Sequence, residues 1–346
     1  IKKYLIDSEN IMRLYSKMMY VNILANQLRG DKARKKTARE EVWQSQYGEA
    51  FRLNQGMDTP ETCVLRTLAY KSLLMAEKMT RVRGVFSPSI IYTDFDLDSI
   101  KEYLCQLEKV NMYVHPCGGK IFELDVFSVY RNFCDTSLPS SGLFIDHFYS
   151  TGALRKLSRG VLPSEPDIFR HSIYQEHSID RTRCELQLKT NATFGSLQQP
   201  LSLRKQYLFR NEGIQVQYIL KNDSPLKLNG VFVTELDLSL INGKKNKHPL
   251  VTVFSEDTRK ETGLEQSGYD DVSWIQLADT CSKCTFTLEA NENPSVSLVP
   301  ITIESKHPGT KEKIQTLNGA RIFLYWTIDL SSNYETEKTV FLKFSC

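Results

Sequence analysis

The chain has 346 residues, of which 41% are hydrophobic, 10% aromatic and 25% charged. This length and composition indicate a folded globular protein with two or three hydrophobic cores and exclude an intrinsically disordered chain. With 44 basic and 41 acidic residues the net charge is +3, and no apolar run approaches the roughly eighteen residues of a membrane span, so we expect neither nucleic acid nor a membrane as a partner.

Residues 1–82 have the pattern of a helical domain. Gly30-Asp31 ends the first predicted helix and begins the second, and Thr59-Pro60 begins a third, because Thr can cap a helix and Pro fits its first turn. Apolar residues recur at steps of three and four along the first helix, as a single buried stripe requires: Ile11, Leu14, Met18, Val21, Ala25 and Leu28. We predict a three-helix segment with one small core.

Residues 83–346 have the texture of β structure, with short alternating runs separated by turn residues. Asn242-Gly243 is a hairpin signal. Strands are predicted near residues 110–114, 121–126, 214–220, 236–240, 249–254, 272–277, 296–303, 320–330 and 339–344. Many closely spaced strands with few helical patterns between them indicate a large antiparallel sandwich, so the predicted fold class is α+β.

The eight cysteines are scattered, and only Cys281 and Cys284 lie close together. A structural zinc site would need a second Cys or His pair at ligand spacing, and none follows. We interpret the cysteines as free thiols in a reducing compartment and expect a cytoplasmic protein.

The most informative motif is the run Trp43-Gln44-Ser45-Gln46-Tyr47-Gly48-Glu49-Ala50-Phe51. It resembles the segment after the catalytic barrel in glycoside hydrolase family fifty-seven, the amylase and 4-α-glucanotransferase group, where the run reads Trp-x-x-Gln-x-Asn-Asp-Ala-Tyr-Trp-His-Gly. Trp43, Gln46 and Ala50 match, and Glu49 and Phe51 are near substitutions. Gly48, Arg52, Leu53 and Asn54 depart from the pattern, so the scaffold looks kept while much of the sugar-facing chemistry looks altered.

The resemblance continues through the β-rich half. The acidic loop 94–98, the strand Gly118–Asp125 (Gly-Gly-Lys-Ile-Phe-Glu-Leu-Asp), the run 146–148 and the run 232–238 all have counterparts in the family's C-terminal region. The relatives of that region are sandwiches of the galactose-mutarotase-like superfamily. The resemblance therefore implies that residues 83–346 form a sandwich of this type and that the preceding helices are a post-barrel segment.

The resemblance also implies a glucan contact in the helix–loop segment. Trp43, Gln46, Glu49 and Phe51 are the candidate substrate-binding residues, because aromatic rings stack on sugar faces while amides and carboxylates bond to hydroxyls. The alternative is that Trp43 and Phe51 pack between helices and that Gln46 and Glu49 are solvated.

Asp94, Asp96 and Asp98 alternate as the carboxylates of calcium loops do. The sixth position of such a loop is normally Gly and is Ser99 here, and the twelfth would be Cys105 instead of a bidentate Glu. Calcium is therefore a weak candidate cofactor, and an acidic turn is the alternative.

Other acidic or His positions lie in strand-like segments: Glu123, Asp125, Asp146, His147, Glu235 and Asp237. Paired acidic and His side chains could carry out acid–base chemistry on a sugar, as a mutarotase does. The alternative is that the acidic residues form a hydrogen-bonded or solvated strand face and that His147 is structural.

The chain contains no alternating strand–helix barrel. The family's nucleophile and acid would lie upstream of Ile1, so we predict no catalytic residues here and a catalytically silent chain. The first hypothesis is a non-catalytic C-terminal region of an α-amylase or 4-α-glucanotransferase-like protein, whose partners are an upstream barrel and an α-glucan. The second is a degenerate relative that serves carbohydrate binding or assembly. The third is a mutarotase- or epimerase-like sandwich enzyme, which a clustered His–Glu pair on the sandwich would favour.

Overall fold

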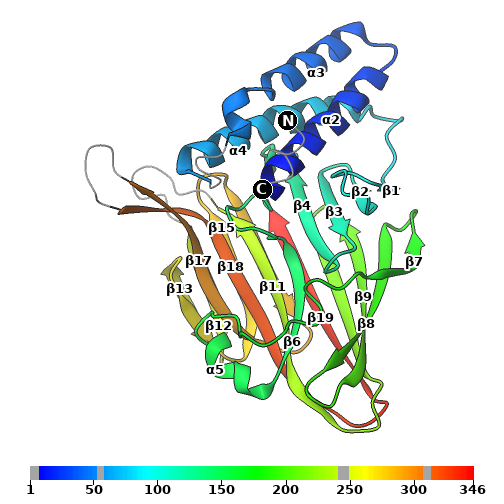
Figure 1. Cartoon of the computed structure of the whole chain (residues 1–346). Coiled ribbons are helices and arrows are strands. Elements are labelled where there is room, and N and C mark those ends of the chain that lie inside the picture. Colours follow the sequence, from blue (N-terminus) through cyan, green and yellow to red (C-terminus); the bar gives the residue numbers. More distant parts are fainter. Residues whose placement is uncertain (1–7, 53–57, 241–248, 307–312) are drawn as a thin grey trace.

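The computed structural model describes residues 8–52, 58–240, 249–306 and 313–346. Helices α2, α3 and α4 come first in the described chain and sit together at one end of the strands (Figure 1). The helical elements are α2 (Glu9–Gln27), α3 (Lys32–Gln44), η1 (Gly48–Phe51), α4 (Pro60–Thr80), η2 (Thr151–Ala153) and α5 (Leu154–Leu157). None of the described helices is both long and apolar enough to cross a membrane.

The helix starts follow from local capping chemistry. Ser8 accepts a hydrogen bond from the N–H of Ile11 at the start of α2, and Asp31 caps α3 in the same way. Thr59 and Thr62 form a reciprocal capping box at the start of α4. These bonds satisfy backbone N–H groups that the first turn of a helix leaves unpaired, which is why the starts predicted near residues 31 and 59 are confirmed.

Two antiparallel sheets form the rest of the described chain, which confirms the predicted β-sandwich. The first sheet runs in the order β1 (Ser89–Thr93), β2 (Glu102–Gln106), β3 (Val110–His115), β4 (Lys120–Val126), β6 (Leu143–Tyr149), β11 (Leu228–Ser239), β18 (Lys313–Leu330), β17 (Ser295–Lys306) and β14 (Ser267–Tyr269), with β5 (Arg131–Asn132) beside β4. The second runs β13 (Thr258–Gly263), β12 (Leu250–Ser255), β15 (Val272–Asp279), β16 (Cys284–Ala290), β19 (Glu335–Ser345), β10 (Gly213–Asn222), β9 (Gln199–Arg210), β8 (Glu185–Phe194) and β7 (Gln175–Asp180).

Each of the nine predicted strand runs overlaps a strand of the structure, and only Leu240 and Pro249 lie outside one. None of the nine runs covers β1, β2, β5, β6, β7, β8, β9, β13, β14 or β16. The predicted hairpin at residues 242–243 lies outside the described residues. The inner faces of the two sheets share one apolar core, to which both β4 and β10 contribute alternate residues such as Leu124 and Val216.

Strands β3 and β4 are buried on both faces. Met112 and Leu124 point into the sandwich core, while their neighbours Tyr113 and Glu123 face the helices. The helices thus cover the outer face of the first sheet at β3 and β4. The carboxylates of Glu123 and Asp125 are completely buried, so they do not form the solvated strand face that was one alternative from the sequence.

Buried ion pairs join the helices to this face. Lys17 on α2 contacts Asp125 on β4 at 2.7 Å and Glu77 on α4 at 2.8 Å, and all three side chains are at most 1% exposed. Tyr70 on α4 donates a hydrogen bond to Glu123 at 2.8 Å. Because charges are expensive to bury without partners, these contacts specify how α2 and α4 lie on the sheet.

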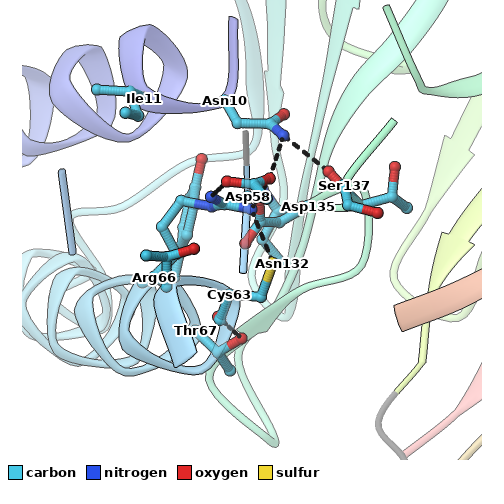
Figure 2. A network of polar contacts seen from close by, with 12 residues as sticks. Asn10, Ile11, Asp58, Cys63, Arg66, Thr67, Asn132, Asp135 and Ser137 are labelled. Carbon is cyan, nitrogen blue, oxygen red and sulfur yellow. Dashed lines mark hydrogen bonds and ion pairs between the residues drawn. The ribbon is translucent and has the colours of Figure 1, made fainter. Parts of the chain in front are cut away.

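A second network anchors the start of α4 (Figure 2). Arg66 is fully buried; its Nε donates to Asp135 at 2.9 Å, and its terminal nitrogens contact both carboxylate oxygens of Asp58. Asn10 on α2 donates to the same Asp58 and to the carbonyl of Thr136 at 2.8 Å. One guanidinium therefore connects the two helices to the loop that follows β5.

Cys284 and Cys346 form a disulfide, with their Cα atoms 4.2 Å apart. The expectation of free thiols is therefore wrong for this pair. Strands β16 and β19 pair so that Thr285 lies opposite Ser345, and this register brings the flanking cysteines together across 62 residues of sequence. Sequence spacing does not reveal such a register.

Candidate functional site: a cavity beside the acidic loop

A cavity of about 520 Å³ lies where α2 meets the first sheet. Its wall combines one acidic loop with a set of basic side chains from three other segments. The lining residues are Glu9, Met12 and Arg13 of α2, Asp96, Leu97 and Asp98 of the β1–β2 loop, His115 of β3, Cys117 of the β3–β4 turn, Lys120 and Phe122 of β4, and Ser140, Ile145, Arg170 and His171. A concave site of this size with convergent polar groups is suited to a small polar ligand.

The acidic end of the cavity is built by the loop between β1 and β2. Asp96, Asp98 and Glu102 place one carboxylate oxygen each near Nε2 of His115, at 3.8, 3.4 and 3.7 Å. One ligand atom from each of the four residues lies within 4.8 Å of the other three. The loop reaches this shape through left-handed backbone conformations at Leu97 (φ 64°) and Ser99 (φ 77°).

The charge at this end is only partly compensated. Burial raises the pKa of Glu102 to about 8, and the charges of Asp96 and Asp98 add to that rise. Burial and the neighbouring Asp98 raise the pKa of Asp96 to about 6. Burial lowers the pKa of His115, so the ring is neutral at pH 7. Because burial and neighbouring negative charge raise these pKa values, positive charge that arrives at this end would lower them and would be bound favourably.

The opposite end is basic. Arg13 forms an ion pair with Glu9, and Lys120 contacts Glu9 at 3.3 Å. Burial alone would raise the pKa of Glu9, but the charges of Arg13 and Lys120 lower it to about 2. Burial and the charge of Arg13 lower the pKa of Lys120. This end can therefore donate hydrogen bonds to hydroxyl or anionic groups of a ligand.

Arg170 connects the cavity wall to a buried network on β6 and β11. Its guanidinium contacts Glu235 at 3.1 Å, and Glu235 in turn contacts Nε2 of His147 at 3.0 Å, while Asp167 contacts Nδ1 of the same ring. Burial alone would lower the pKa of His147, but its bonds to Asp167 and Glu235 raise it to about 9. Arg321 also contacts Glu235, at 2.8 Å. His147 and Glu235 are both completely buried, so this pair lies behind the wall rather than in the cavity.

The four residues predicted to bind glucan are not in this cavity. Trp43 (57% exposed), Gln46 and Glu49 are exposed on α3 and on the segment after it. Trp43 lies under the guanidinium of Arg39, 5.3 Å from the ring centroid, and Glu49 contacts Arg52 at 3.2 Å. Phe51 is half-buried and packs on the apolar core of the helices. Leu53 and Asn54, two departures from the motif, lie outside the described residues.

The group of potential metal ligands does not contain the same residues as the predicted calcium pattern. Asp96 and Asp98 join the potential metal-binding group, whereas Asp94 does not. Glu102 and His115, which the sequence reasoning missed, complete the group, and Cys105, at the position where a calcium loop has its Glu, is buried in the sandwich core. Glu102 sits eight residues after Asp94, at the ninth position of that loop, where calcium loops often have a ligand that acts through water. This spacing was the signal that could have found it.

Comparison with known proteins supports the family resemblance. The family model described as alpha-amylase/4-alpha-glucanotransferase, C-terminal, matches residues 140–339. The structure is similar to that of the 4-alpha-glucanotransferase from Thermococcus litoralis, with a TM-score of 0.74 and 15% identity, over 99% of this chain and 50% of that one. The chain thus spans half the length of that protein. No curated protein sequence matches the chain.

The sandwich is also similar to two other solved structures. A galactose mutarotase-like protein from Lactobacillus casei aligns with a TM-score of 0.54 and 10% identity, over 70% of this chain and 100% of that one. A putative aldose 1-epimerase from Escherichia coli K12 aligns with a TM-score of 0.51 and 8% identity, over 71% of this chain and 99% of that one. These similarities show that the β-rich half shares its fold with these proteins, and a shared fold does not by itself show a shared activity.

Proposed function

Because the chain belongs to the alpha-amylase/4-alpha-glucanotransferase C-terminal family, we propose that it is the non-catalytic C-terminal region of an enzyme of this kind and supports its glucan-binding cleft. The observation that carries the proposal is the family match, which spans residues 140–339. In this role the chain has two domains, a helical domain in residues 1–82 and a β-sandwich domain in residues 83–346. Helices α2, α3 and α4 are the post-barrel segment, and the catalytic nucleophile and acid belong to the barrel.

An apolar surface on the helices supports this role. Trp43, Tyr47, Val64 and Leu68 are each more than half exposed. Tyr47 and Leu68 line a groove between α3 and α4 together with Leu65 and Met75 of α4. A groove with exposed aromatic and aliphatic side chains is typical of a protein contact or a sugar platform. We assign this surface to the catalytic barrel and to the end of its glucan cleft.

The glucan contact is proposed at Trp43, Gln46, Glu49 and Phe51. Trp43 presents an exposed ring for stacking, and the exposed Gln46 and Glu49 offer polar groups to sugar hydroxyls. Phe51 supports the segment from the helical core rather than facing solvent.

Calorimetric titration of the chain with maltoheptaose tests this contact. We expect millimolar or tighter binding that Trp43→Ala abolishes, whereas Tyr334→Ala, at another exposed aromatic residue (67% exposed) between β18 and β19, leaves it unchanged. No heat with any α-glucan overturns the glucan contact and leaves the supporting or assembly role. The upstream reading frame tests that role, because a barrel with a strand-end Glu and Asp is expected there.

A mutarotase-like activity is the second candidate, favoured by the contact between His147 and Glu235 on the sandwich. Such chemistry needs an acid and a base that reach the sugar. Here both side chains are completely buried, and Asp167, Arg170 and Arg321 hold them in ion pairs. Polarimetry on freshly dissolved α-D-galactose and α-D-glucose is expected to show only the spontaneous rate, and acceleration that His147→Gln abolishes would establish this candidate instead.

A cytoplasmic location is also proposed, because Cys63, Cys105, Cys134 and Cys184 are buried free thiols. The disulfide between Cys284 and Cys346 is the observation against it. An alkylating agent added to the native cell, followed by counting of the modified thiols, tests the location. In a reducing compartment Cys284 and Cys346 are free thiols and become alkylated, whereas in an oxidising one they remain bonded and unmodified.

A further inference from the structure

The three carboxylates of the acidic loop divide their oxygens in the same way. One oxygen of each is occupied by the loop backbone: Asp96 accepts from the N–H of Asp98 at 3.3 Å, Asp98 from Ile100 at 2.6 Å, and Glu102 from Phe95 at 2.5 Å. The second oxygen of each carboxylate is the one that lies near His115. The loop backbone therefore orients three free oxygens toward a common point.

Glu102 provides the independent sign of a missing ligand. Its side chain is 0% exposed, and its Oε1 has no hydrogen-bond partner within the described part of the protein. A buried carboxylate oxygen without a partner costs several kcal/mol in general, so such atoms are rare unless an ion or water completes them. Of the basic side chains of the cavity, Arg13 and Lys120 are both engaged by Glu9, which leaves Oε1 without a protein cation.

We propose that Asp96, Asp98 and Glu102 bind a divalent cation of the calcium type through these three free oxygens. Calcium takes carboxylate, carbonyl and water oxygens at about 2.3–2.6 Å in flexible geometry, whereas zinc is usually held by Cys and His. A group of three carboxylate oxygens beside a water-accessible cavity therefore fits calcium better. The remaining coordination positions face the cavity, whose wall includes Asp96 and Asp98, and water can fill them.

His115 takes a supporting role in this site. Its Nδ1 accepts a hydrogen bond from the N–H of Cys117 at 2.9 Å, so the proton of the neutral ring is on Nε2. A protonated Nε2 can donate to Asp98, whose carboxylate oxygen is 3.4 Å away, and cannot coordinate a metal at the same time. The ring therefore positions the carboxylates, and an oxygen-liganded cation is favoured over zinc.

The site would attach the loop between β1 and β2 to the sheet at the mouth of the cavity. Leu97, 60% exposed at the tip of this loop, lines the cavity, so its position depends on how the loop is held. Cation binding stabilises the folded protein by mass action, which makes the melting temperature depend on cation concentration. This inference stands apart from the proposed glucan contact, which lies on α3 and the segment after it.

The test uses the whole chain, freed of metal by a chelator and titrated calorimetrically with CaCl₂, beside thermal unfolding with and without CaCl₂. We expect saturable one-to-one binding and a rise in melting temperature of several degrees. Glu102→Gln, which keeps an acceptor for the N–H of Phe95, is expected to lower the calcium affinity at least tenfold while leaving the metal-free protein as stable as the wild type. Asp98→Asn, on a more exposed side chain, is the second variant and is expected to act in the same direction.

Asp94→Asn is the matched control from the same loop, because Asp94 is not part of the group. It is expected to change calcium affinity less than about threefold, whereas loss of binding in this variant would overturn the assignment in favour of the calcium-loop register that begins at Asp94. Absence of any calcium effect on heat or melting temperature overturns the site. Tighter binding of ZnCl₂ that His115→Gln abolishes overturns the oxygen-only ligand set.

Discussion

Replacing Lys17 by Met tests whether buried charge pairing holds the helices to the sandwich. Met keeps the unbranched length of the side chain, so the packing of α2 changes little while the ammonium group is lost. Asp125 then loses its contact at 2.7 Å and Glu77 its contact at 2.8 Å, both in completely buried surroundings. Removing one partner of a buried ion pair generally costs about 3–5 kcal/mol.

The structure places the expected loss near the lower end of this range. Glu77 keeps the guanidinium of Arg81 at 3.1 Å, and Asp125 keeps the amide of Asn111 at 2.9 Å. Asp125 is the group left with an uncompensated charge, since Lys17 is the cation it pairs with in the described structure. We expect the free energy of unfolding to fall by about 3 kcal/mol.

Urea denaturation measures the loss, and hydrogen exchange followed by mass spectrometry shows where it acts. Amides of α2 are expected to lose protection before those of β10 in the second sheet. In the double variant Lys17→Met/Asp125→Asn the uncompensated charge is gone, and at least half of the lost stability is expected to return. A cost below about 1 kcal/mol for Lys17→Met, or a double variant no more stable than the single one, would refute the reasoning.

Three further predictions concern the sandwich. The pKa of His147 in the folded protein, about 9, exceeds its ordinary value of about 6.5, so its stabilisation is fully present below pH 6.5 and is lost as the pH rises to about 9. The free energy of unfolding, measured by urea denaturation, is expected to fall over that window by an amount on the order of 3 kcal/mol, and a fall of equal size in His147→Gln would contradict the assignment. Gly230→Ala would place a methyl group 2.5 Å from the ring of Phe148 and 2.8 Å from the backbone oxygen of Tyr149, both on the neighbouring strand. Thermal unfolding should show a cost of about 1–3 kcal/mol, and an unchanged melting temperature would contradict this clash. Cys346→Ser opens the loop closed by its bond to Cys284 and should lower stability by about 2–4 kcal/mol under oxidising conditions but not with reductant, so equal losses in both would count against a disulfide.

Much of the secondary structure could be read from neighbouring residues. The caps at Asp31 and Thr59 act over three residues, and the alternation in 214–220 follows from the two-residue period of a strand. Strand β7 escaped prediction because its residues are largely polar and exposed. Strand β8 does alternate, with Leu186 and Leu188 buried between more exposed neighbours, but its polar second half hides the pattern. Short-range rules identify elements only where one face is clearly apolar.

The candidate site was predictable only in part. The alternating Asp96 and Asp98 drew attention to the correct loop, and Ser99 does adopt the left-handed conformation that favours Gly at the matching position of a calcium loop. Glu102 lies at the ninth position of that register and could have been found by counting, whereas His115 joins the group only because β2 and β3 are neighbouring strands. The exposure of Trp43 and the half-burial of Phe51 likewise depend on how α3 lies against α4.

By itself the sequence determined the elements and the order of motifs that identifies the family, because both depend on residues close together in the chain. Tertiary structure decided which distant groups meet. Lys17 reaches Asp125 across 108 residues, His147 reaches Glu235 across 88, and Cys284 reaches Cys346 across 62. These contacts depend on strand register and on the packing of helices against a sheet. Their energies come from desolvated charges and closed loops, which only the folded chain creates.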